Sequence, residues 1–124
     1  MSVTVTSQKT IQITDSNGAQ DLKGVSASVQ GTAYVQSNGL NIGTSPTTIT
    51  LPATNVTYLH MKNLHATQTV TVTWTPSGGA SNVVKTIQPG GFIEFLDANG
   101  SGGITALSVT ASGASTPIEY ILLG

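Results

Sequence analysis

The chain contains no cysteine and no arginine, and both absences narrow its chemistry. Without cysteine it can form neither a disulfide nor a thiolate metal site, so the sequence gives no hint of a redox compartment. Without arginine it has no guanidinium fork with which to grip an acidic substrate. Four lysines against five acids leave a net charge of -1. We therefore expect no nucleic-acid partner, because binding a phosphate backbone requires a positively charged surface.

Charged residues of either sign are scarce. They make up 7% of the chain, whereas ordinary soluble domains carry about 25%. Serine, threonine, asparagine and glutamine must therefore supply most of the polar surface. Such a surface resists association weakly, because charge is what keeps proteins apart. Two interpretations follow: much of the surface meets other subunits, or the chain is a secreted-type β-domain with a neutral face.

Long hydrophobic runs are also missing. No stretch approaches the ~20 apolar residues that span a bilayer, so we expect no membrane partner. The opening sequence MSVTVTSQKT has no basic start followed by an apolar run, so we expect no signal peptide. A chain of 124 residues is predicted to form a single domain over residues 1–124, large enough for one core.

What the chain does contain is a succession of short β-like runs. β-branched residues dominate these runs, clusters of Gly, Asn, Pro or Ser separate them, and no window shows a helical stripe. Some eight to ten short strands in one domain predict an all-β, antiparallel β-sandwich of jelly-roll-like type. The predicted strands are Val3–Thr6, Thr10–Thr14, Val25–Val29, Thr32–Gln36, Thr47–Leu51, Val56–Lys62, Gln68–Trp74, Val83–Gln88, Phe92–Leu96, Ile104–Thr110 and Ile118–Leu123.

The segment MKNLHATQTVTVTW, from Met61 to Trp74, shows the alternation most clearly. Val70, Val72 and Trp74 share one parity and threonines share the other, so the first set is predicted to face a core. Upstream, the run Tyr58–Lys62 is another candidate strand. Residues Asn63–Thr67 form a short connection between it and the alternating run that ends at Trp74. The segment therefore predicts a β-hairpin with His65 in its loop.

Turn residues separate the predicted strands. Asn-Gly pairs tolerate the positive φ that tight turns require, and Pro-Gly presets the φ of a turn. The predicted turns are Asn17-Gly18, Asn38-Gly39, Pro76–Gly79, Pro89-Gly90, Asn99-Gly100 and Ala111–Ser115.

The first 14 residues stand apart from the rest. Val3 and Val5, and then Ile11 and Ile13, alternate well, but Ser7-Gln8-Lys9 interrupts the pattern. Residues 1–14 are therefore predicted to be either the first hairpin of the sandwich or an N-terminal arm that adds a strand to a neighbour. We favour the intramolecular alternative.

Candidate catalytic and metal-binding residues are few. His60 and His65 could converge, but zinc needs three or four ligands, and the chain has no third histidine and no cysteine. No G-x-S-x-G elbow occurs, and the two acids at Glu94 and Glu119 lie within strand patterns. We expect no enzyme, no catalytic residue, no cofactor and no metal site. A carboxylate pair for glycoside cleavage would have to come from Asp15, Asp21, Glu94, Asp97 and Glu119.

Two loops carry the pattern D-x-N-G. The residues Asp15–Asp21 and Asp97–Gly100 could offer oxygen ligands to calcium, which takes six to eight of them. The first loop lacks the bidentate glutamate of an EF-hand, and turn formation by Asp and Asn-Gly explains both loops more simply. Whether the Asp15–Asp21 loop binds calcium stays open at this point.

A carbohydrate-binding module is the main alternative function. Sandwich modules bind sugars on a platform of exposed aromatic rings, and this chain is thinly supplied with them. Trp74 is expected in the core, while Phe92 and Phe95 fall on opposite parities, so that one of them can be exposed. The aromatic residues are Tyr34, Tyr58, Trp74, Phe92, Phe95 and Tyr120.

Three phrases occur in order over about residues 56–124: LHMKNLHATQTVTV, IQPGGFIEFL and ALSVTASGASTPIEYILLG. In this order they resemble small β-sandwich virion proteins of tailed bacteriophages, which are capsid decoration proteins or tail- and fibre-associated proteins. The resemblance implies a non-enzymatic structural protein on the capsid exterior that binds the major capsid protein and stabilises the shell. It also implies a homotrimer at local threefold positions. The residues before 56 match no such phrase, so the mode of attachment is not implied.

Overall fold

The computed structural model describes residues 2–16, 18–97 and 103–124, with the backbone alone described for residues 10–15 and 19–25. The described residues form ten strands and no helix, which confirms the predicted all-β class. No helix of sufficient length and hydropathy to cross a bilayer occurs in these residues. The strands are β1 (Val3–Asp15), β2 (Gly18–Gly31), β3 (Tyr34–Ile42), β4 (Thr47–Thr48), β5 (Tyr58–Asn63), β6 (Val70–Pro76), β7 (Val83–Ile87), β8 (Phe92–Leu96), β9 (Ile104–Ala111) and β10 (Thr116–Leu123).

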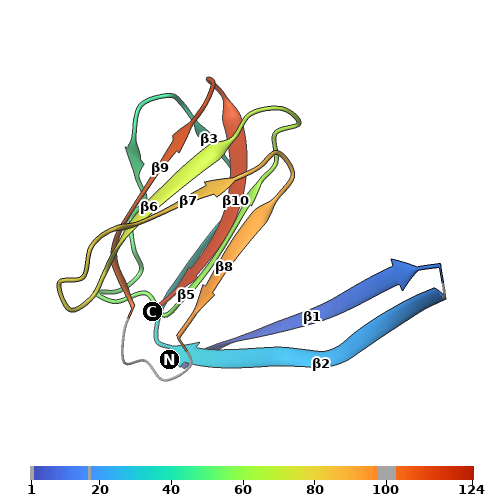
Figure 1. The fold of residues 1–124 in the computed structure, drawn as a ribbon. Helices are drawn as coiled ribbons and strands as arrows, with labels where there is room; N and C mark the ends of the chain where they lie inside the picture. Colours follow the sequence, from blue (N-terminus) through green and yellow to red (C-terminus); the bar gives the residue numbers. More distant parts are fainter. Residues whose placement is uncertain (1, 17, 98–102) are drawn as a thin grey trace.

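Eight of the strands form two four-stranded sheets that face each other (Figure 1). One sheet has the order β3-β10-β5-β8 and the other the order β4-β9-β6-β7. Every neighbouring pair is antiparallel. This arrangement confirms the predicted antiparallel β-sandwich.

The core lies between the two sheets and follows from side-chain alternation. Leu59 and Met61 enter it from β5, while Val70, Val72 and Trp74 enter it from β6, as the sequence predicts. The first four are fully buried and Trp74 is 9% exposed. Burying each such aliphatic side chain contributes about 1.5 to 3 kcal/mol. The rest of the buried cluster is Ile42, Ile49, Val56, Ile87, Ile104, Leu107, Val109, Ala111, Ile118 and Leu122.

The predicted hairpin around His65 is wrong. The strands β5 and β6 belong to different sheets and pair with other partners. Both strands alternate with one face toward the core, but they reach it from opposite sides. Residues 64–69 therefore cross the roughly 10 Å between two packed sheets instead of closing a ladder.

Of the predicted turns, one is confirmed, one is wrong, and two lie wholly or partly outside the described residues. The Pro89-Gly90 turn is confirmed: Gly91 N donates to Gln88 O at 2.9 Å, and Gly90 has a φ of 73°. The Asn38-Gly39 turn is wrong, because both residues lie inside β3, where the register with β10 shifts. There the pair forms a β-bulge, which also accommodates an extra residue. Asn17 and the whole Asn99-Gly100 pair lie outside the described residues.

The N-terminal segment lies outside the two sheets of the sandwich. Strand β1 pairs along its length with β2 as a two-stranded sheet of its own, and this arm projects away from the sandwich (Figure 1). The predicted interruption at Ser7-Gln8-Lys9 is wrong, because β1 runs through it. The irregularity is a register shift between Lys9 and Ile11. The pairing is intramolecular, as favoured, but the partner is residues 18–31 and the hairpin stands outside the two sheets.

Candidate functional site

The base of the arm is fixed to the outer face of one sheet by an apolar cluster. Val29 of β2, Tyr58 of β5 and Leu123 of β10 are buried together, at 5%, 5% and 0% exposure. Tyr58 lies on the outer face of β5 by alternation, and it is the arm that covers it. Partly buried hydrophobic residues around these three are Val3, Val5, Leu96 and Ile121.

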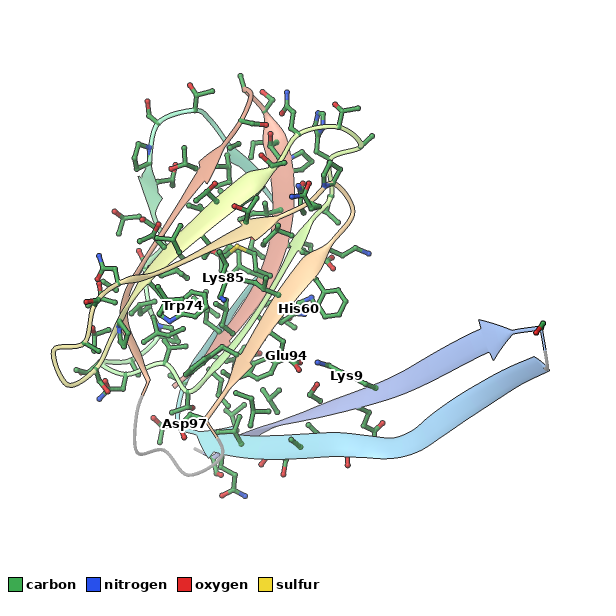
Figure 2. The ribbon with its side chains drawn as sticks, viewed as in Figure 1. Lys9, His60, Trp74, Lys85, Glu94 and Asp97 are labelled. Carbon is green, nitrogen blue, oxygen red and sulfur yellow. The ribbon has the colours of Figure 1, made fainter. Side chains whose placement is uncertain are left out.

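Beside this cluster, Glu94 of β8 joins the arm to the sandwich through polar contacts (Figure 2). Lys9 Nζ lies 2.7 Å from Glu94 Oε1. Ser7 Oγ donates to Glu94 Oε2 at 2.6 Å, and Tyr58 Oη donates to the same oxygen at 2.9 Å. Lys9 Nζ also lies 5.9 Å from the centre of the Phe92 ring. Two arm residues and two sandwich residues therefore meet at one carboxylate, a group we call the Glu94 latch (Ser7, Lys9, Tyr58 and Glu94).

Within the latch, the pKa values of Glu94 and Tyr58 are shifted. Partial burial by itself raises the pKa of Glu94, but the hydrogen bonds from Lys9, Ser7 and Tyr58 outweigh this and hold that pKa below its usual value. Burial, and then the neighbouring Glu94, raise the pKa of Tyr58. Glu94 thus remains a carboxylate whose oxygens already have donors. This chemistry suits a fixed attachment of the arm.

A cleft of about 510 Å³ is lined in part by Leu96 and Asp97, which lie at the end of β8. Figure 2 shows Asp97 close to the base of the arm. The rings of Trp74 and Phe95 lie 6.1 Å apart at the wall of this cleft, inclined by 57°. Trp74 offers little of its surface to the cleft, since it is 9% exposed. Of the two phenylalanines, Phe92 is the exposed one, as the parity argument allowed, and it lies beside the latch rather than the cleft. The cleft is lined by Trp74, Pro76, Ser77, Val83, Phe95, Leu96, Asp97 and Gly103.

A second groove, of about 440 Å³, runs between the β3 and β4 edges of the two sheets. Tyr34, at 56% exposure, lies along it. All of the described residues that line this groove are uncharged. We call it the β3–β4 groove, and its lining residues are Ala33, Tyr34, Val35, Leu40, Thr47, Thr48, Ile49, Thr50, Leu51, Pro52 and Tyr120.

The two histidines have separate partners. His60 Nε2 lies 3.9 Å from Glu119 Oε1, and its ring lies 5.8 Å from that of Phe92. His65 Nδ1 accepts hydrogen bonds from the backbone N–H groups of Thr67 and Gln68, both at 3.0 Å. Among the side chains that the structure describes, those of residues 2–9, 16, 18, 26–97 and 103–124, no three His, Cys, Asp or Glu form a group that could hold a metal.

At the end of the sandwich away from the arm, a buried asparagine joins two connections, the one between β5 and β6 and the one between β7 and β8. Asn63 Nδ2 lies within hydrogen-bonding distance of the carbonyls of Gln68, Ile87 and Gln88, at 2.7, 3.3 and 3.3 Å. Its Oδ1 accepts from His65 N at 3.0 Å. Sequence reasoning treated Asn63 as part of a loop. The sequence signal for a structural role of Asn63 is side-chain alternation, because this polar residue follows Leu59 and Met61 on the inward-facing side of the strand.

The structure describes only part of the two loops that are candidates for calcium binding. The side chains of Asp15 and Asp21, and the whole of Asn17, lie outside the described part of the chain. Asp97 lines the Trp74 cleft, and the other residues of its D-x-N-G motif are outside the description. The structure therefore adds no ligand set for either loop.

Comparison of the chain with protein-family models, with curated proteins and with solved structures gave no match. The proposal for the function of this chain therefore rests on its own fold and surfaces.

Proposed function

We propose that this chain is a non-enzymatic structural protein of a tailed-bacteriophage virion, a decoration protein that binds the major capsid protein on the capsid exterior and stabilises the shell. The observation that carries the proposal is the arm. An isolated two-stranded hairpin is marginally stable in water. A ribbon with strands of 13 and 14 residues, anchored at one end and projecting at the other, therefore suits a protein whose working state includes neighbours.

The strand order supports a finer assignment of the fold. The pairs β3·β10, β4·β9, β5·β8 and β6·β7 are nested, as in one long hairpin folded over on itself. We infer from this nesting that the sandwich is a jelly roll. Double-sheet jelly rolls occur in viral capsid proteins and also in lectins and cupins, so the fold favours the proposal by analogy only.

Surface chemistry favours the same function. With 7% charged residues, the faces between the subunits of a shell could be brought together at little cost in charge desolvation. The mechanism of such a protein is mechanical: it buries apolar and neutral polar surface against copies of itself and against the capsid lattice. The assembly that we propose in solution and at local threefold positions is a homotrimer.

The decisive experiment compares phage particles made with and without this gene. We expect the chain in purified particles at a copy number comparable to that of the major capsid protein, measured by quantitative mass spectrometry. Particles that lack it should release their DNA at a lower temperature. A few copies per particle would instead indicate a tail- or fibre-associated protein, and absence from particles would contradict the proposal.

A carbohydrate-binding module is the second candidate, because the Trp74 cleft places two aromatic rings beside the carboxyl residue Asp97. Under this alternative, glycans should change the fluorescence of Trp74, the only tryptophan of the chain. A glycan screen that leaves the fluorescence unchanged would remove this candidate.

A further inference from the structure

The four sheet edges of the sandwich differ in how they are protected. Unpaired edges invite association, and proteins protect them with charges, short strands or covering segments. Strand β8 carries Glu94 and borders the arm, β7 carries Lys85, and β4 has only two residues. Strand β3 has nine residues and contains neither a charged residue nor proline. Its bulge lies past Ser37, so the stretch from Tyr34 to Ser37 is a regular, unprotected edge.

The β3–β4 groove adjoins this edge. It brings exposed Tyr34 and the partly buried side chains of Val35, Leu40 and Leu51 to an uncharged surface. An edge that offers unpaired backbone groups beside an apolar groove fits a β-ribbon, which can add a strand to the edge and place alternate residues in the groove.

The arm contains a ribbon of this kind. Val3 and Val5, at alternate positions of β1, contact the sandwich at the base. The same alternation continues to Ile11 and Ile13, and the register pairs Ile11 with Leu22. Figure 1 shows this distal part of the arm, residues 10–16 and 18–25, projecting away from both sheets. The pattern that binds the base to its own sandwich is thus repeated where no part of the described sandwich lies beside it.

We propose that the β3 edge and the β3–β4 groove bind the distal arm of a second copy of this chain. The donor and acceptor lie at opposite edges of one sheet, because the arm leaves beside β8 and the sheet order is β3-β10-β5-β8. The arm points away from β3 (Figure 1), so it does not reach the β3–β4 groove of its own chain. The part of β1 beyond the Lys9 contact, residues 10–15, extends about 20 Å, which is long enough to pair with the regular stretch from Tyr34 to Ser37 of a second copy.

A contact of this kind is head-to-tail, with a different surface on each partner. Head-to-tail contacts produce closed rings when the rotation between neighbours closes, and open filaments when it does not. The inference rests on the self-association that the proposed function includes, and it assigns the two surfaces that make that contact. A trimer is the ring expected from it.

The groove can be blocked at exposed positions without touching the core. The double variant Gln36→Lys/Thr50→Lys puts two charges on the β3 edge and the groove, and both residues are exposed. The matched control Gln88→Lys/Thr86→Lys makes the same two substitutions at exposed positions at and near β7. The arm is shortened separately by joining Lys9 to Val25 through Asn-Gly, a two-residue hairpin turn that keeps the anchored base.

The readout is molar mass by light scattering on a sizing column, with cooperative urea unfolding to show that each variant is folded. We expect the wild-type chain and the control to be oligomers of the same mass, and the blocked-groove and short-arm variants to be monomers. Mixing these two variants should give a one-to-one heterodimer, because one intact arm then meets one intact groove. A monomeric wild type would overturn the inference, as would a blocked-groove or short-arm variant of wild-type mass.

The outcome is separable from that of the proposed function. A chain that is monomeric in solution but abundant on capsids would overturn the arm exchange and leave the decoration role in place. A chain that assembles through its arm but is absent from particles would support the arm exchange and contradict the decoration role.

Discussion

The two ends of the sandwich are held together in different ways. At the end away from the arm, Asn63 and His65 join two sheet-crossing connections, β5–β6 and β7–β8, through buried or partly buried hydrogen bonds. At the other end, the Glu94 latch and a small apolar cluster attach an arm that is otherwise outside the sandwich. The first end links segments that cannot separate without opening the core. The second holds a segment that lies outside the main core, so we expect it to detach while the core stays folded.

This difference predicts two kinds of stability. Proteins open locally and globally with different free energies, and a weakly attached segment opens at the lower cost. Substitutions at the Asn63 end should therefore change the urea midpoint of the whole chain. Those at the latch should change hydrogen exchange in the arm and leave the global midpoint nearly constant.

The largest effect is expected for Asn63→Ala. The substitution removes the amide that serves the Gln68, Ile87 and Gln88 carbonyls and accepts from His65 N. Removing these four contacts of a fully buried side chain, one bond buried and three partly buried, should lower the free energy of unfolding by about 2 to 4 kcal/mol. Equilibrium urea unfolding measures it. The control is Asn82→Ala, which removes only an exposed bond from Thr75 Oγ1 and should cost less than about 0.5 kcal/mol. Equal losses in the two variants would contradict the special role of Asn63.

The next effect is expected for Glu94→Gln, and it should be confined to the arm. The amide keeps an acceptor for Ser7 or Tyr58 but loses the charge opposite Lys9, whose side chain is 40% exposed. We therefore expect a loss of about 1 kcal/mol, discounted for solvent screening, in the free energy of arm opening. Amide hydrogen exchange at β1 and β2 measures it. Glu119→Gln is the control, because Glu119 lies outside the latch.

The same carboxylate gives the arm a pH dependence. The folded-state pKa of Glu94 lies below its ordinary value, so its contribution is complete above about pH 4.3 and is lost as the pH falls through the folded pKa. Arm exchange, corrected for the intrinsic rate at each pH, should show increasing opening on acidification. Glu94→Gln should flatten this component. An identical profile in the variant would show that another group controls the arm.

A smaller effect, on global stability, is expected for His65→Ala. Its Nδ1 accepts from the N–H groups of Thr67 and Gln68 at 3.0 Å, but Thr67 is exposed and water can replace the ring there. The expected loss is about 1 kcal/mol, measured by urea unfolding. His60→Ala is the comparison, since His60 makes only a 3.9 Å contact with Glu119 and packs beside Phe92. A larger loss of unfolding free energy in His60→Ala would contradict the prediction that the Asn63 end contributes more to global stability.

The fold class could be predicted because alternation depends on the chain alone. The series Val70, Val72, Trp74 faces the core in the structure as in the sequence pattern. Alternation says which side of a strand is inward, but not which of two sheets the strand joins. For this reason the β5–β6 hairpin prediction failed, even though both strands were placed nearly correctly.

The site at the base of the arm was harder to predict, because its partners are distant in sequence. Ser7 and Glu94 are 87 positions apart, and the polar run Ser7-Gln8-Lys9 resembles a break in a strand. In the structure, Ser7 and Lys9 leave the apolar series of Val3 and Val5 at the point where the arm meets a carboxylate. The signal was a charged residue at an inward-parity position, which only a partner from elsewhere in the chain could explain.

The smallest effect is expected for Ser7→Ala, which removes one donor from the latch and leaves Lys9 and Tyr58 in place. We expect arm opening to become easier by about 0.5 kcal/mol. Because the Ser7 hydrogen bond helps to hold the pKa of Glu94 down, its loss should also move the acid loosening of the arm to a higher pH. Ser28→Ala, at an exposed position of β2, supplies the control. If both variants exchange alike at every pH, Ser7 contributes nothing to the latch and the apolar cluster alone would anchor the arm.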